Sequence, residues 1–120
     1  MAEMIRIGCA LGGHSNTLMG LSGLGDLVLT CTSKISRNMS LGIELGKGIP
    51  LENILSSRTS VAEGISTSSA VCLLAKKLNQ EMPISNAVNS ILHYDLPINE
   101  AIESLLERPF KTESDIKYNF

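Results

Sequence analysis

Apolar residues recur along the chain at the helical spacing i, i+3, i+4, i+7, in short segments that glycine or proline separates. Ile84, Ala87, Val88 and Ile91 show this spacing directly behind a proline. The pattern predicts an all-α fold of about six or seven helices. They are drawn from the segments 4–11, 16–19, 24–31, 36–45, 50–55, 61–78, 84–91 and 98–105.

Two of these segments leave alternatives open. Segment 16–19 is at most a short turn of helix. Segment 24–31 has helical spacing at Leu24, Leu27, Val28 and Cys31, but its middle reads equally as a short buried strand. The helix is the favoured interpretation because the rest of the chain has no convincing strand pattern.

The length and composition fit one small domain. A chain of 120 residues is too short for two ordinary domains, and 43% of its residues are hydrophobic. Only 3% are aromatic, so the core is expected to be aliphatic. We expect a helical domain over residues 1–110 and a frayed polar tail over residues 111–120.

The charge pattern excludes several classes of protein. The net charge is −2, and the basic residues are scattered, so the chain lacks the basic patch of a nucleic-acid-binding protein. No apolar run reaches the roughly 20 residues of a membrane span, and the first residues show no signal-peptide pattern. We therefore expect a cytoplasmic protein that does not insert into membranes.

The cysteines and histidines show no metal-ligand spacing. Cys9, Cys31 and Cys72 are odd in number and form no CxxC pair, so we expect reduced, buried thiols. His14 and His93 lie far apart in sequence. The sequence therefore predicts no metal site.

Residues 21–38 hold the first group of candidate functional residues. If this stretch is helical, the carboxylate of Asp26 and the hydroxyl of Thr30 lie one turn apart on one face. A buried carboxylate needs hydrogen-bond donors, which a substrate hydroxyl would supply. By residue chemistry alone, however, an ordinary helix N-cap at Asp26 is the more common arrangement.

The second group is Ser36-Arg37-Asn38, at the predicted start of a helix. Backbone amides at a helix start, an arginine fork, a hydroxyl and an amide side chain together suit a phosphorylated ligand. The alternative for Arg37 is a solvated arginine on a helix surface. Glu63 likewise has two interpretations, a hydrogen bond to a cofactor or a capping box with Ser60.

The sequence Gly-Leu-Ser-Gly-Leu-Gly-Asp-Leu-Val-Leu-Thr-Cys-Thr followed by Ser-Arg-Asn resembles the substrate-domain signature of bacterial-type NAD(P)-dependent glycerol-3-phosphate dehydrogenases. The resemblance extends from Ala2 to Arg108. It implies an all-helical C-terminal, substrate-binding domain of the 6-phosphogluconate-dehydrogenase-like type. The N-terminal Rossmann domain of that family, which binds most of the NAD or NADP, is expected to be absent from this chain.

The resemblance also implies the activity and the site residues. The family interconverts dihydroxyacetone phosphate and sn-glycerol 3-phosphate by hydride transfer and supplies the glycerol phosphate of membrane lipids. Its catalytic lysine matches no residue here, so we expect no catalytic residue in this chain and no activity of the chain alone. The motif match assigns substrate binding to Asp26, Thr30, Ser36, Arg37 and Asn38, and cofactor binding to Arg37, Val61 and Glu63.

A different class of function stays open beside this one. The chain could be a non-enzymatic helical module for assembly or binding. A pure scaffold has no reason to keep a carboxylate at 26 and an arginine at 37 facing one pocket, so these two residues discriminate between the hypotheses. A domain separated from its Rossmann partner is expected to expose the apolar surface that the partner covered, and we therefore expect a homodimer or larger species.

Overall fold

The computed structural model describes residues 1–59 and 62–109, and these residues form eight α-helices, one π-helical turn and no strand. The all-α prediction is confirmed, and the helix count exceeds the expected six or seven because the short segments form separate helices. The tail expected over residues 111–120 lies outside the described residues. The elements are α1 (Ala2–Ala10), α2 (Ser15–Met19), η1 (Leu21–Gly25), α3 (Asp26–Thr32), α4 (Arg37–Gly46), α5 (Leu51–Ser57), α6 (Gly64–Lys77), α7 (Pro83–His93) and α8 (Ile98–Leu106).

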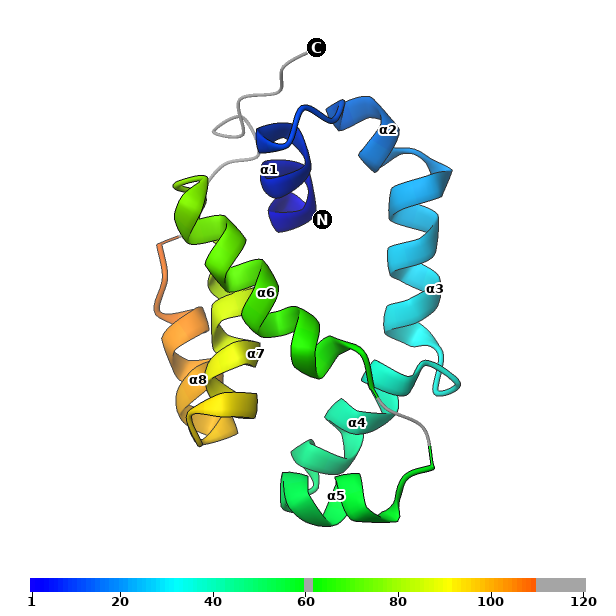
Figure 1. Cartoon of the computed structure of the whole chain (residues 1–120), viewed down its shortest axis with the longest axis vertical. Helices are drawn as coiled ribbons and strands as arrows, with labels where there is room; N and C mark the ends of the chain where they lie inside the picture. Colours follow the sequence, from blue (N-terminus) through cyan, green and yellow to red (C-terminus); the bar gives the residue numbers. More distant parts are fainter. Residues whose placement is uncertain (60–61, 110–120) are drawn as a thin grey trace.

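The helices follow one another around the molecule (Figure 1). Helices α2, η1 and α3 form one side, α4 and α5 form one end, and α6, α7 and α8 pack together on the opposite side, with α1 at the other end beside α6. Helix α6 contacts α7, and α7 contacts α8. Short loops connect these three helices, so neighbouring helices run in opposite directions.

Segment 24–31 is helical, so the strand alternative is wrong. The π-helical turn η1 continues directly into α3, and Gly25 and Asp26 both have right-handed helical backbone angles. Gly23 is buried in this turn, and a Cβ atom there would lie 1.9 Å from the carbonyl oxygen of Leu18. A glycine therefore lets the turn pack against the end of α2.

Local signals explain where several helices begin and end. Gly12 and Gly48 have φ angles of +90° and +80°, and they follow α1 and α4 as the predicted stop signals. Pro83 is the first residue of α7, where a missing amide hydrogen costs nothing. These boundaries were predicted because each depends on residues adjacent in sequence.

The buried core lies where α4, α5 and the beginning of α6 meet. Its fully enclosed members are Leu41, Ile54 and Ala62. Leu45, Leu51, Ile65 and Leu92 pack against them. Leu41 is one turn after Arg37, and Ala62 precedes Glu63, so this core fixes the two chain segments that hold the candidate site.

A buried carboxylate joins α1 to α7. Glu3 is 9% exposed, and its carboxylate accepts hydrogen bonds from the amide of Ile84, the amide of Ser85 (3.0 Å) and the hydroxyl of Ser85 (2.7 Å). These donors belong to the first turn of α7, where a negative charge is favourable. Nearby, Arg6 Nε donates to the carbonyl of Glu81 at 2.8 Å.

The exposure of α3 contradicts one expectation. The cysteines of the described chain are free, as predicted, but Cys31 is exposed while Cys9 and Cys72 are half-buried. No residue of α3 is buried, and among the described elements its main contacts are with η1, which precedes it, and with α4, which follows it. None of the described helices is long and apolar enough to cross a membrane.

Candidate functional site

Ser36 caps α4, as the sequence predicted. Its Oγ accepts a hydrogen bond from the amide of Met39 at 3.3 Å, and its carbonyl accepts one from the amide of Ser40 at 2.9 Å. Within residues 1–59 and 62–109, the amides of Arg37 and Asn38 have no acceptor. The first turn of α4 therefore presents two free N–H groups.

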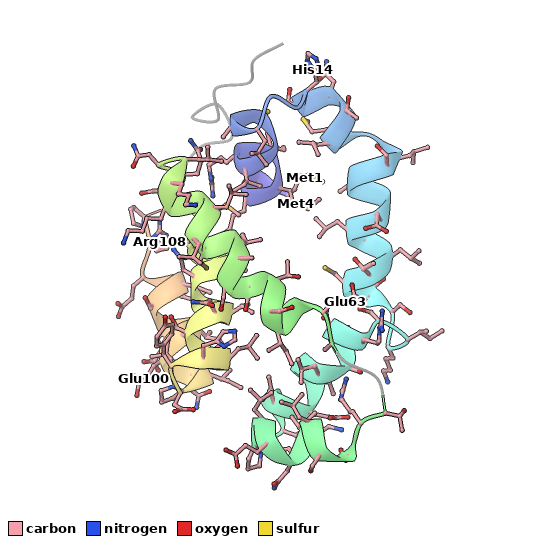
Figure 2. All side chains as sticks on the ribbon, in the orientation of Figure 1. Met1, Met4, His14, Glu63, Glu100 and Arg108 are labelled. Atoms are coloured by element: carbon pink, nitrogen blue, oxygen red, sulfur yellow. The ribbon has the colours of Figure 1, made fainter. Side chains whose placement is uncertain are left out.

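Arg37 is joined to Glu63 across the sequence. Arg37 Nη2 lies 3.1 Å from Glu63 Oε1, and the two side chains are 53% and 77% exposed. Glu63 precedes the first residue of α6, on the side where the chain arrives from α5 (Figure 2). The ion pair therefore connects the start of α4 with the start of α6 and leaves most of the arginine fork accessible.

Asn38 makes a second connection between the same two helix starts. Its Oδ1 accepts a hydrogen bond from the amide of Gly64 at 2.9 Å. A Cβ atom on residue 64 would lie 2.7 Å from Asn38 Oδ1, so a larger residue would have to displace the Asn38 side chain. Gly64 was not among the predicted site residues, because its partner Asn38 lies 26 positions away in the sequence.

Asp26 and Thr30 lie one turn apart on α3, as expected. Thr30 Oγ1 donates to the backbone carbonyl of Asp26 at 2.8 Å. Both residues are exposed, and the Asp26 carboxylate has no hydrogen-bond or ion-pair partner in the described part of the chain. The N-cap interpretation of Asp26 is wrong, because its backbone is already helical and its side chain caps no amide.

A pocket of about 470 Å³ lies between α3, α4, α6, α7 and α8. The residues that line it include three predicted substrate residues and the newly found glycine, namely Thr30, Ser36, Asn38 and Gly64. Its lining also includes the apolar side chains of Leu41, Val88 and Leu92. Asp26 and Arg37 are not among the residues that line this pocket. The expectation that these two residues face a common pocket is therefore not fulfilled by this pocket.

Comparison with known protein families identifies the family of this chain. Residues 1–103 match the family described as the C-terminus of NAD-dependent glycerol-3-phosphate dehydrogenase. The chain belongs to this family. The resemblance noted in residues 21–38 is thereby confirmed for most of the chain.

Individual relatives agree with this assignment. A glycerol-3-phosphate dehydrogenase [NAD(P)+] of Rhodospirillum rubrum is 54% identical over 113 residues, which are 94% of this chain and 32% of that protein. The same enzyme of Parvibaculum lavamentivorans is 50% identical over 94% of this chain. The crystal structure of a glycerol-3-phosphate dehydrogenase from Coxiella burnetii matches 88% of the chain with a TM-score of 0.83 and 43% identity. The chain spans about a third of the length of these relatives.

Two expectations for this domain concern the start of α6. Val61 and Ser60 lie outside the described residues, so the expected cofactor contact of Val61 is not described. The capping box of Ser60 and Glu63 requires Glu63 inside the helix, but α6 begins at Gly64. The long helix therefore starts three residues later than the predicted Val61.

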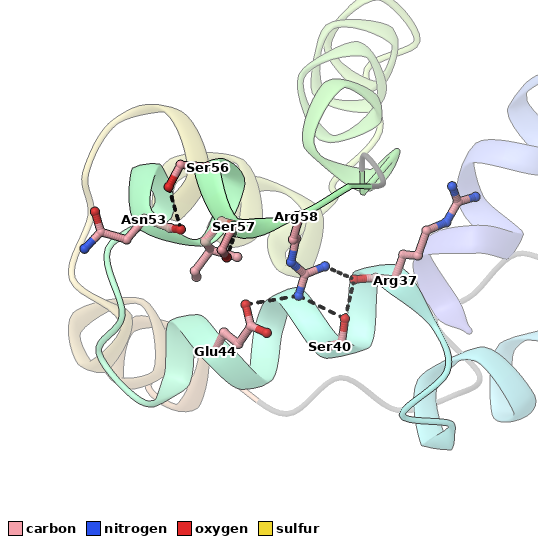
Figure 3. A network of polar contacts seen from close by, with 8 residues as sticks. Arg37, Ser40, Glu44, Asn53, Ser56, Ser57 and Arg58 are labelled. Atoms are coloured by element: carbon pink, nitrogen blue, oxygen red, sulfur yellow. Dashed lines mark hydrogen bonds and ion pairs between the residues drawn. The ribbon is translucent and has the colours of Figure 1, made fainter.

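The described residues also include a structurally important arginine that no sequence pattern predicted. Arg58, directly after α5, is 14% exposed and forms an ion pair of 3.2 Å with Glu44 of α4. It lies behind the first turn of α4 (Figure 3). The described residues contain no cluster of histidine, cysteine or acidic side chains that could hold a metal ion.

Proposed function

We propose that this chain forms the substrate-binding side of a glycerol-3-phosphate dehydrogenase that interconverts dihydroxyacetone phosphate and sn-glycerol 3-phosphate with NAD or NADP. The observation that carries the proposal is the start of α4. There Ser36, Arg37 and Asn38 place two free amides and an accessible arginine fork side by side. The family assignment supports the same chemistry.

In this proposal the phosphate group binds at the first turn of α4. The free amides of Arg37 and Asn38 donate to phosphate oxygens, and the positive end of the helix dipole favours the anion. The guanidinium of Arg37 grips two further oxygens, as its planar fork allows. Binding of the phosphate group supplies binding energy at a distance from the reacting carbon. This binding energy keeps the substrate in its reactive orientation.

Asp26 and Thr30 act at the other end of the substrate. The exposed carboxylate of Asp26 accepts a hydrogen bond from a substrate hydroxyl or orients the catalytic lysine, which has no counterpart in this chain. The cofactor, held mainly by a Rossmann domain outside this chain, supplies or accepts hydride at C2. Arg37, Val61 and Glu63 contribute contacts to it. The chain alone is expected to be inactive.

Steady-state kinetics test this proposal. The matching segment of the Rhodospirillum rubrum relative, 113 residues long, is replaced by this chain, and NAD(P)H oxidation is followed with dihydroxyacetone phosphate. The chimera is expected to be active and the 120-residue chain to be silent. Arg37→Ala in the chimera should raise KM by about 10- to 100-fold, since it removes charge-assisted hydrogen bonds. A folded chimera without activity would contradict the proposed function.

We also propose that the protein is cytoplasmic and self-associates. Apolar side chains of η1 and α3 are exposed, with Leu21 at 93% and Leu29 at 66%. Apolar surface of this kind promotes contact between protein molecules. Sedimentation velocity should show a homodimer or larger species, and Leu29→Glu should shift it toward the monomer. A monomer at all concentrations would contradict this part of the proposal.

A further inference from the structure

Arg58 connects the end of α5 to the first two turns of α4. Its Nη1 donates to the backbone carbonyl of Arg37 at 3.2 Å, and its Nη2 donates to Ser40 Oγ at 3.0 Å. The same Nη2 lies 3.2 Å from Glu44 Oε2. Ser40 Oγ in turn donates to the carbonyl of Arg37 at 3.1 Å, so two groups hold the backbone at residue 37.

The two arginines point in opposite directions. Figure 3 shows the Arg37 side chain extending away from Arg58, while its backbone carbonyl faces the Arg58 guanidinium. Arg58 therefore touches the helix start from the core side. The Arg37 fork is left on the opposite side from Arg58, and its donors stay available to the proposed phosphate.

The contacts of Arg58 carry a cost as well as a gain in stability. The side chain is mostly buried, and its buried Nε has no hydrogen-bond partner among the described residues. An unpaired polar group of this kind lowers stability and offsets part of what the hydrogen bonds and the ion pair of the guanidinium contribute. A cation beside the first turn of a helix is also at the unfavourable end of the helix dipole. The Glu44 carboxylate, 3.2 Å away, compensates this charge, so Arg58 acts on the helix start mainly through its hydrogen bonds.

We propose that Arg58 is a positioning residue of the phosphate site. It fixes the backbone at residue 37 and so sets the direction in which Arg37 and the free amides face the substrate. This inference rests on the proposed function. It predicts that Arg58 acts on substrate affinity although it does not touch the substrate.

Kinetics of the chimera described above test the inference. Arg58→Met fills the volume without the hydrogen bonds, and we expect KM for dihydroxyacetone phosphate to rise about tenfold while kcat changes less than threefold. Arg58→Lys keeps the charge with a single donor group and should recover part of the loss. Ser40→Ala removes the second contact at the carbonyl of Arg37 and should raise KM by a smaller factor. Glu52→Gln is the matched control, since Glu52 lies on the exposed surface of α5, and it should leave KM within twofold.

The outcomes separate this inference from the proposed function. An inactive parent chimera overturns the proposed function and the inference with it. An active chimera in which Arg58→Met lowers the melting temperature but leaves KM unchanged overturns the inference alone, because Arg58 would then serve stability only. If Arg58→Met does not fold, Arg58→Lys and Ser40→Ala decide, and unchanged KM in both overturns the inference.

Discussion

Arg37 and Glu63, 26 residues apart in the sequence, form an ion pair of 3.1 Å that joins the starts of two helices. The pair places a carboxylate on the arginine that is proposed to bind phosphate. An incoming phosphate therefore competes with Glu63 for one of the donors of Arg37. The affinity of the site depends on this competition as well as on the free amides of α4.

Removing the charge of Glu63 tests the competition. We expect Glu63→Gln to strengthen binding of inorganic phosphate to the 120-residue chain by about two- to fivefold, measured by NMR titration of the α4 amides. The free energy of unfolding should change by less than about 1 kcal/mol, because both partners of the pair are exposed. Weaker phosphate binding in this variant would contradict the proposed competition.

A methyl group at residue 64 tests the second connection. Gly64→Ala should displace the Asn38 side chain, since the new Cβ would lie 2.7 Å from its Oδ1. We expect KM of the chimera to rise and the free energy of unfolding to fall by about 1–3 kcal/mol. Gly42→Ala is the control in the middle of α4, where no atom lies within 4 Å of the new methyl group. It should stabilise the helix by about 0.5–1 kcal/mol.

The contact between α1 and α7 is expected to be important for stability. Glu3→Gln replaces an acceptor carboxylate by an amide whose NH₂ group faces amide and hydroxyl donors. We expect a loss of about 2 kcal/mol in the free energy of unfolding, measured by urea denaturation. Glu103→Gln, on the exposed surface of α8, should change it by less than about 0.5 kcal/mol. Equal effects of the two substitutions would show that the buried contact contributes nothing.

The three thiols should differ in reactivity. Burial, with a smaller effect of the Glu3 charge, raises the pKa of the Cys72 thiol above its ordinary value. Iodoacetamide should therefore alkylate Cys72 more slowly than the exposed Cys31 at pH 8, measured in single-cysteine variants. As the pH rises, the Cys72 thiol of the folded protein therefore loses its proton at a higher pH than the same thiol in the unfolded chain. The contribution of Cys72 to stability should therefore fall as the pH rises from the ordinary cysteine pKa to the raised one.

Features set by neighbouring residues could be predicted from the sequence. The cap at Ser36, the helix start at Pro83 and the helical nature of segment 24–31 depend on side chains within a few positions of one another. The same holds for the placing of Asp26 and Thr30 on one face. Helical spacing and cap chemistry carry this information because both are local.

Features that depend on distant contacts could not be predicted. The residues that hold Arg58 in place lie 14 to 21 positions earlier in the chain, and nothing around Arg58 sets it apart from a surface arginine. The exposure of Cys31 was missed because an apolar stripe shows which side a helix would bury, but not whether another element covers it. Gly64 combines both situations. The sequence shows a glycine near a predicted helix start, but it does not show that Asn38 lies against this glycine.

The hydrogen bonds of Glu3 also affect the order in which the molecule assembles. Glu3 and Ser85 are 82 positions apart, so the first helix cannot reach its final position on the ribosome until most of the domain has been synthesised. Joining such distant segments is slow in comparison with forming single helices. Until then, the apolar face of α1 is available to chaperones and to other nascent chains.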